Sequence, residues 1–141
     1  MMIDLHNNIE VRRLISPDEG ASSNTAKVSQ IIDLANVNAC EFLIATGTLV
    51  DADATFTVLV EDGDNSALTD NAAVPDEFLL GTEAGAAITF ADDDEVRKIG
   101  YKGPKRYVRL TITPASNTGA WDICAMAVLA HHRKGPQSSQ T

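Results

Sequence analysis

The stretch Arg97–Pro114, RKIGYKGPKRYVRLTITP, carries the clearest strand signal in the chain and decides the fold. In its second half Val108, Leu110 and Ile112 occupy every second position, and polar residues lie between them. This period-2 alternation is typical of a strand that buries one face and exposes the other. Residues 102–105, KGPK, are turn formers, because Gly and Pro favour tight turns. We therefore predict two strands joined by a tight turn, that is, a β-hairpin.

The buried face of this hairpin requires a second sheet to cover it. The best candidate is the segment 54–61, ATFTVLVE, in which Phe56, Val58 and Val60 recur at every second position. β-Branched and aromatic residues at this spacing fit a half-buried pleated surface. We therefore expect residues 54–61 to lie in the sheet that faces the hairpin.

Other short segments bounded by turn residues also have the pattern of strands. They are residues 27–34, 41–48, 78–80, 86–90 and 121–129. Because no segment has a convincing helical period, about seven to nine short strands predict an all-β fold, namely a two-sheet antiparallel sandwich or jelly-roll-like domain with an extended N-terminal arm. The expected core consists of the large apolar residues Phe42, Phe56, Leu59, Phe90, Leu110, Ile112 and Trp121.

The chain of 141 residues has the length of one domain, and its sequence divides into three parts. Residues 28–130 are expected to form the sandwich. Residues 1–27 allow two interpretations: a first edge strand followed by a long loop, or an extended arm that becomes ordered only against a neighbouring subunit. Residues 131–141, HHRKGPQSSQT, contain no hydrophobic residue to bury, so we expect a flexible tail.

The charge of the chain is strongly negative and unevenly distributed. The formal net charge is −9, which argues against a non-specific nucleic-acid binder, since such proteins gather positive charge against phosphates. Residues 28–96 contain no Lys or Arg, whereas six of the eleven basic residues lie within residues 97–109. We therefore expect a marked charge asymmetry, suited to contacts with copies of the chain or with a patterned partner surface.

Cys40 and Cys124 are the two cysteines, and small or apolar residues surround each of them. A disulfide between them is one alternative, but we favour two buried free thiols, because no sequence feature indicates an oxidising compartment. Residues 1–6, MMIDLH, lack the basic start and apolar core of a signal peptide, and no apolar run is long enough to cross a bilayer. We therefore expect a soluble protein that is made in the cytoplasm and binds no membrane.

Motifs for catalysis are absent from the sequence. The three histidines, His6, His131 and His132, lie in the first or last eleven residues, where side chains are rarely held with the precision that catalysis requires. The sequence contains no G-x-S-x-G, H-E-x-x-H or C-x-x-C motif. We therefore expect that the protein is not an enzyme and has no cofactor.

Three acidic turns offer oxygen atoms that could hold Ca²⁺. They are residues 51–53, 62–65 and 92–94, and none has the spacing of an EF-hand loop. We favour solvated turn carboxylates at all three and expect no metal. The adjacent pair His131 and His132 is a poor transition-metal site, because neighbouring histidines in a tail rarely point to one centre.

The basic residues are the strongest candidates for a contact surface. Tyr and Arg are enriched in protein interfaces, although long basic side chains also cover sheet edges against unwanted pairing. We favour a subunit or partner contact, made by Arg12, Arg13, Arg97, Lys102, Lys105, Arg106, Tyr107 and Arg109.

From about Asn24 to Ala130 the sequence resembles a family of small proteins encoded in the structural gene clusters of tailed bacteriophages and prophages. The matching phrases include GTLVDADATFTVLVEDGD, residues 47–64, and RKIGYKGPKRYVRLTITP, residues 97–114. The resemblance implies a virion component, and more specifically a head decoration (cement) protein that stabilises the capsid. Such a protein binds across neighbouring subunits of the major capsid protein.

The same resemblance implies further properties. They are a homotrimer, a position on the capsid exterior after synthesis in the host cytoplasm, a tether formed by residues 1–27, and no binding of nucleic acid. Two alternatives remain open. The first is a head–tail connector or tail component, and the second is a carbohydrate-binding jelly roll in which Trp121, Tyr101 or Tyr107 stacks on sugar.

Overall fold

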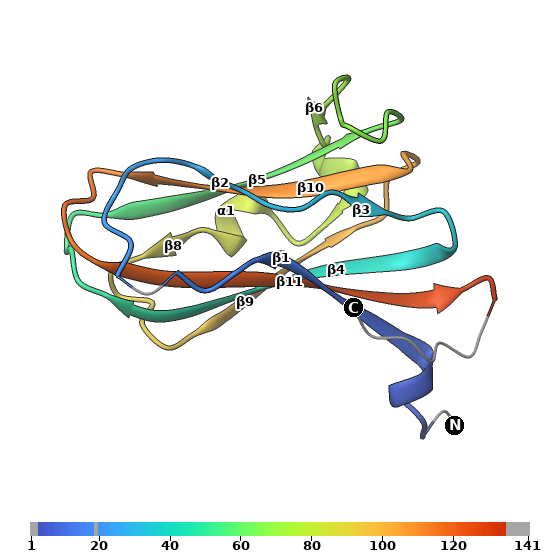
Figure 1. Ribbon diagram of the computed structural model, residues 1–141, viewed down its shortest axis with the longest axis horizontal. Helices are drawn as coiled ribbons and strands as arrows, with labels where there is room; N and C mark the ends of the chain where they lie inside the picture. The colour runs from blue at the N-terminus through green and yellow to red at the C-terminus, as the bar shows by residue number, and fades with distance from the viewer. Residues whose placement is uncertain (1–2, 19, 135–141) are drawn as a thin grey trace.

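The computed structural model describes residues 3–18 and 20–134, which form two antiparallel β-sheets packed face to face (Figure 1). Sheet A has the strand order β1-β11-β4-β9-β7, and sheet B has the order β2-β10-β5-β6, with β3 also paired to β10 and β8 to β5. The predicted all-β, two-sheet antiparallel sandwich is therefore confirmed. Among the described residues, no helix has the length and apolar character needed to cross a membrane.

The strands of sheet A are β1 (Ile9–Ile15), β4 (Val37–Leu49), β7 (Leu79–Leu80), β9 (Val96–Tyr101) and β11 (Trp121–His132). Those of sheet B are β2 (Lys27–Val28), β3 (Ile32–Asp33), β5 (Thr55–Gly63), β6 (Ala72–Ala73), β8 (Ile88–Thr89) and β10 (Tyr107–Ala115). Three short helical segments complete the described chain: η1 (His6–Asn8), η2 (Asp76–Phe78) and α1 (Glu83–Ala86).

The predicted hairpin is wrong, because its two strands belong to different sheets. β9 pairs with β4 and β7 in sheet A, whereas β10 pairs with β5, β2 and β3 in sheet B. Residues 102–106 cross from one sheet to the other, and five residues readily span the ~10 Å between packed sheets. The crossing lets Ile99 of β9 and Val108 of β10 point into the same core from opposite sides, and both are fully buried.

Residues 54–61 are also placed differently from the prediction. β5 does not face β10 across the core; it is the neighbour of β10 within sheet B, with Leu110 opposite Val60 and Ile112 opposite Val58. Directly opposed residues of an antiparallel pair point to the same side, so the two alternating patterns combine into one buried face. Sheet A provides the facing layer.

The core lies between the sheets and contains most of the expected residues. Phe42, Phe56, Leu110, Ile112 and Trp121 are each at most 1% exposed. The rings of Phe56 and Trp121 lie 5.3 Å apart, centroid to centroid, and are tilted by 51°. A tilted aromatic pair at this distance adds to the stabilisation from buried area alone.

Two expected core residues lie elsewhere. Phe90 is 41% exposed, because β8 ends at Thr89 and Phe90 begins the turn that leads to β9. Leu59 is half-buried, since it lies on the outer face of sheet B, out of phase with Val58 and Val60.

Two predicted strands are shorter than expected. The segment 27–34 divides into β2 and β3 around Ser29, whose N–H donates to the Leu110 carbonyl at 2.8 Å while its Oγ accepts from the Leu110 N–H at 2.9 Å. The segment 86–90 begins inside α1, which starts with a Thr82 cap that accepts from the Gly85 N–H at 2.9 Å. Local side-chain bonds of this kind compete with strand pairing.

The ends of the described chain join sheet A. Within residues 1–27, β1 pairs with β11 and forms an edge strand, and β11 continues to His132. The Arg133 N–H then donates to the Asn36 carbonyl at 3.0 Å. Residues 135–141 of the expected tail lie outside the described residues. The three-part division of the chain stays a prediction.

Both cysteines are free thiols. Cys40 faces the core and is 5% exposed, and burial raises the pKa of its thiol to about 12. Cys124 is only half-buried, on the outer face of sheet A. Cys40 lies opposite Leu129 and Cys124 opposite Ala45, so the thiols are several residue pairs apart along the β4–β11 ladder, too far for a disulfide.

Candidate protein interface

The outer face of sheet B is polar and internally paired. Thr57 lies opposite Thr113, and Glu61 lies opposite Arg109. The Arg109 Nε donates to Glu61 Oε2 at 2.8 Å, and both side chains are largely buried, with 21% and 15% exposure. Apart from Leu59 and the exposed Val28, which both lie opposite Thr111, this face offers little apolar area to a partner.

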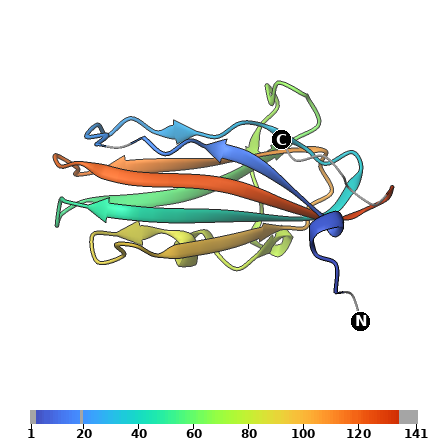
Figure 2. The ribbon, with the colours of Figure 1, turned by 60° about the horizontal axis from the view of Figure 1, so that its bottom comes forward.

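The outer face of sheet A is apolar. We call it face A and define it by Val11, Leu43, Ala45, Val96, Cys124, Met126 and Val128. The registers place these side chains side by side, with Val11 opposite Val128 and Leu43 opposite Met126. Figure 2 brings the strands of sheet A forward, with η1 at one end of them. An apolar area of this kind on a sheet is a candidate site of protein contact.

Charged side chains interrupt face A at three points. Arg13 lies opposite Met126, Lys98 opposite Leu43, and Glu41 opposite Val128. Burial raises the pKa of Glu41 above its ordinary value, and the nearby Lys98 opposes that effect. The Glu41 carboxylate is therefore already partly removed from water before any partner binds.

Gly100 allows Glu41 to lie flat on sheet A. A Cβ at Gly100 would lie 2.6 Å from Glu41 Oε2 and 2.9 Å from the Leu80 Cβ, so no larger residue fits beneath these two side chains. The glycine thus lets Glu41 of β4 and Leu80 of β7 pack directly on the backbone of β9, beside face A.

A shallow groove of about 370 Å³ lies at the β1–β11 side of face A. It is lined by Val11, Ile15, Pro17, Cys124 and Met126, among others. The β1–β11 register shifts between Arg13 and Ile15, and such a bulge bends the edge strand away from its neighbour. The groove is a suitable site for an apolar side chain of a partner.

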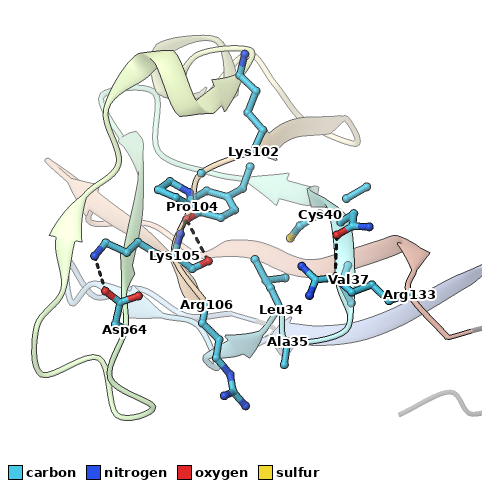
Figure 3. A pocket seen from close by; sticks show the side chains of 14 residues that line it. Leu34, Ala35, Val37, Cys40, Asp64, Lys102, Pro104, Lys105, Arg106 and Arg133 are labelled. Atoms are coloured by element: carbon cyan, nitrogen blue, oxygen red, sulfur yellow. Dashed lines mark hydrogen bonds and ion pairs between the residues drawn. The ribbon is translucent and has the colours of Figure 1, made fainter.

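A second hollow, which we call the basic pocket, lies at the end of the sandwich where residues 102–106 cross between the sheets (Figure 3). Its volume is about 530 Å³. Leu34, Val37, Cys40 and Tyr101 provide an apolar floor. Its rim carries four basic side chains: Lys102, Lys105, Arg106 and Arg133.

Tyr101 fixes the shape of this pocket. Its Oη donates to Asp62 Oδ2 at 2.7 Å and accepts from the Lys105 N–H at 3.1 Å. A Cβ at Gly103 would lie 2.6 Å from Tyr101 ring carbons, so the crossing segment packs directly on the ring. Burial, followed by the hydrogen bond to Asp62, raises the pKa of Tyr101 above its ordinary value.

The four rim cations differ in their partners. Lys105 pairs with Asp64, and Arg106 forms a two-pronged pair with Asp33 at 2.8 and 2.9 Å. Arg133 Nε donates only to the neutral Asn38 Oδ1, at 3.3 Å. Within the described part of the chain, Lys102 has no recorded side-chain partner. Two cations of the rim therefore lack a carboxylate.

The predicted interface residues do not form one surface. Lys102, Lys105 and Arg106 meet at the basic pocket, while Tyr107 and Arg109 lie on the outer face of sheet B. The Arg106 guanidinium stacks over the Tyr107 ring, 5.1 Å from its centroid. The pocket thus brings together three of the eight predicted residues.

The other three predicted residues lie apart from the pocket. Arg12 and Arg13 are on the edge strand β1, where Arg12 pairs with Glu10. Arg97 lies toward the opposite end of the sandwich and pairs with Asp92 and Glu95. Whether any of the eight takes part in an interface stays a prediction.

The expected asymmetry of the basic segment is reduced by folding. The cations of residues 97–109 are distributed over three surfaces, and Arg97, Lys105, Arg106 and Arg109 each pair with a carboxylate from elsewhere in the chain. Local ion pairs therefore take up part of the uneven charge of the sequence, and Lys102 at the basic pocket stays outside them.

The acidic turns cap the backbone. Asp92 accepts from the Thr89 N–H at 2.8 Å, and Asp51 accepts from the N–H and hydroxyl of Thr118 at 2.6 and 2.8 Å. These bonds lower the pKa of both carboxyls. Among residues 3–18 and 20–134, no group of three or more His, Cys, Asp or Glu side chains is placed to hold a metal ion.

The aromatic residues suggested for sugar stacking are largely inaccessible. Trp121 is 1% exposed and Tyr101 is 3% exposed, so neither ring can stack on a ligand. Tyr107 is half-buried beneath Arg106. This burial removes two of the three aromatics on which the carbohydrate-binding alternative depends.

Sequence reasoning missed face A and Arg133. The signal for face A is that β4 and β11 have apolar residues on both sides, for example Leu43 between Phe42 and Ile44. A strand that is apolar on both sides predicts two covered faces. Arg133 was assigned to the tail, and nothing in its neighbours indicates a pocket.

No family model matches the chain, and no curated protein matches it. Solved structures share its fold. The PBSX exported protein XepA is 14% identical with a TM-score of 0.54, over 93% of this chain and 40% of XepA. A structure of infectious bursal disease virus Gt strain is 9% identical with a TM-score of 0.50, over 94% of this chain and 35% of that one.

The SPBc2 prophage-derived protein YomS is 10% identical with a TM-score of 0.45, over 92% of this chain and 97% of YomS. The neighbours thus include a prophage-derived protein and a viral protein. The chain spans less than half the length of XepA and of the viral chain. At these identities the likeness establishes the fold alone.

Proposed function

We propose that the protein is a structural component of a tailed-phage virion, and within it a head decoration protein that binds across neighbouring subunits of the major capsid protein on the capsid exterior. The resemblance of residues 24–130 to phage structural proteins supports this role. The sandwich fold, which also occurs in the viral protein compared above, is compatible with it. We propose no catalytic role.

The observation that carries this proposal is face A. Four neighbouring strands, spaced ~4.8 Å apart and about six residues long, give a face of roughly 19 by 20 Å. This is about half of the ~800 Å² that each partner buries in a standard stable interface. A single copy would therefore bind a flat protein surface weakly.

Weak binding by each copy suits a decoration protein. When copies are linked into an oligomer such as the expected trimer, the second and third contacts become intramolecular, and modest affinities combine into stable attachment. The polar outer face of sheet B, with Glu61 and Arg109 paired, would then remain in solvent.

The test is attachment to phage heads that lack the protein. Replacing Leu43 and Met126, which lie opposite each other on face A, with Gln should weaken binding per site about tenfold, because apolar area is lost at the centre of the contact. The matched control replaces Thr57 and Thr113, which lie opposite each other on sheet B, with Gln as well, and should leave binding unchanged. Co-sedimentation with heads measures both.

Two outcomes would contradict the proposal. Normal attachment of the Leu43→Gln/Met126→Gln variant, with an unchanged melting temperature, would exclude face A. A stained gel of virions gives the copy number, which is in the hundreds for a decoration protein and about a dozen for a connector or tail ring. The connector is the second candidate, and the different charges at the two ends of the sandwich favour it, because contact between unlike ends can close into a ring.

A further inference from the structure

The two ends of the sandwich differ in charge. β4 runs from the basic pocket at Val37 to the opposite end at Leu49, and β9 returns from Val96 to Tyr101. The ends therefore lie far apart along the long axis of the molecule (Figure 1). The far end, which we call the acidic end, consists of residues 50–54, 90–95 and 116–122. Its acidic residues are Asp51, Asp53, Asp92, Asp93, Asp94, Glu95 and Asp122.

The acidic end also carries exposed apolar side chains. Val50 is 58% exposed and Phe90 is 41% exposed, and each lies in a turn with carboxylates. Asp53 and Asp94 are exposed beside them. The end thus offers two exposed apolar side chains in turns that also carry exposed carboxylates, although Asp92 and Glu95 of this end pair with Arg97.

The basic pocket is the complement of this arrangement. Its accessible apolar lining consists of Leu34, Ala35 and Pro104, which lie around the buried Val37, Cys40 and Tyr101. Its rim carries Lys102 and Arg133, the two cations without a carboxylate partner among the described residues. Figure 3 shows Arg133 on one side of the pocket and Lys105, turned toward Asp64, on the other. Apolar and electrostatic complementarity therefore coincide at the two ends.

We propose that the basic pocket binds the acidic end of a second copy of this chain, with Val50 or Phe90 against the accessible Leu34, Ala35 and Pro104, and with Asp53 and Asp94 near Lys102 and Arg133. Contact between opposite ends is heterologous, so it generates a closed ring if the rotation closes and a filament if it does not. This inference concerns self-association and does not depend on whether the protein binds a capsid.

Charge-swapped variants test the proposal in sedimentation velocity at low salt. The pocket variant carries Lys102→Glu and Arg133→Glu. The loop variant carries Asp53→Lys and Asp94→Asn, where Asn is chosen because residue 94 has a φ of 56°, which Asn tolerates. The wild type should form oligomers, and each variant alone should weaken self-association about tenfold or more.

Mixing the two variants gives the decisive result. In a mixed pair, the unchanged pocket of the loop variant can bind the unchanged acidic end of the pocket variant. The equimolar mixture should therefore give a complex that neither variant forms alone. Increasing salt should dissociate the wild-type oligomer, because exposed ion pairs are screened. A wild type that stays monomeric at low salt, or a mixture without complex, would overturn the proposal.

The matched control changes two cations on face A, Arg13→Glu and Lys98→Glu, and should leave self-association intact. Loss of self-association in this control would assign the contact to face A instead, and would overturn the end-to-end arrangement. If a charge-swapped variant fails to fold, salt dependence of the wild type decides, because oligomers that persist unchanged at 1 M salt exclude a contact between charged ends.

Discussion

Tyr101 in sheet A donates a 2.7 Å hydrogen bond to Asp62 in sheet B, and this bond joins the two layers beneath the segment that crosses between them. Asp62 is 7% exposed, so its carboxylate depends on protein donors. Tyr101→Phe should therefore lower the free energy of unfolding by ~1–3 kcal/mol, the usual cost of a buried polar group that loses its partner. Urea denaturation measures the change.

The matched control is Tyr107→Phe, because Tyr107 is half-buried and its hydroxyl has no recorded bond among the described residues. That change should alter stability by less than ~0.5 kcal/mol. Equal effects of the two substitutions would contradict the role assigned to the Tyr101–Asp62 bond.

Alkaline pH should destabilise the protein through the same tyrosine. Its pKa is raised in the folded state by burial and by Asp62, so folding favours the neutral phenol. The resulting stability is complete below the unfolded pKa of ~10 and is lost as the pH rises above it. The free energy of unfolding of the wild type should thus fall more steeply above pH ~10 than that of Tyr101→Phe. Parallel curves for the two proteins would disprove this linkage.

The Glu61–Arg109 pair should show measurable coupling. Arg109→Glu places two like charges opposite each other on β5 and β10 and should destabilise the domain, and the swap Glu61→Arg/Arg109→Glu should recover part of the loss. Coupling of ~0.2–1 kcal/mol is expected for a cross-strand pair. Thermal melts of both single variants and the double variant complete the cycle, and strictly additive changes would mean that the pair contributes nothing.

Leu110→Ala should remove ~2–5 kcal/mol of stability, because Leu110 is fully buried between the sheets and its truncation leaves a cavity. Leu80→Ala is the control, since Leu80 is 52% exposed and its loss should cost far less. Guanidinium titration of the two variants measures their free energies of unfolding. A similar loss for both would contradict the assignment of Leu110 to the core and of Leu80 to the surface.

Alternation along the chain was sufficient to predict which residues are buried in the central strands. Val108, Leu110 and Ile112 of β10, and Phe56, Val58 and Val60 of β5, are all buried. Period-2 patterns report the face on which a side chain lies. They do not report which strands are neighbours, because any two strands of matching phase can share a sheet.

The hydrogen-bonded neighbours of each strand could therefore not be predicted from the sequence. KGPK, residues 102–105, suits a hairpin turn and a crossing between sheets equally well. The Tyr101–Asp62 bond and the packing of Gly103 on the Tyr101 ring favour the crossing, and the first of these joins residues from different strands. The candidate site was missed for a similar reason, since face A and the basic pocket combine side chains from β1, β4, β9 and β11 or from distant loops.

The crossing of the chain between sheets at 50–54, 102–106 and 116–120 has a consequence during synthesis. β4 lies at the centre of sheet A, yet its hydrogen-bonded neighbours are β9 and β11, which are synthesised well after it, and β11 comes last among the described strands. Sheet A cannot close before β11 has been synthesised, so the hydrophobic surface of β4 stays exposed until then. A chain that is truncated before β11 would thus keep this surface uncovered and be prone to aggregation.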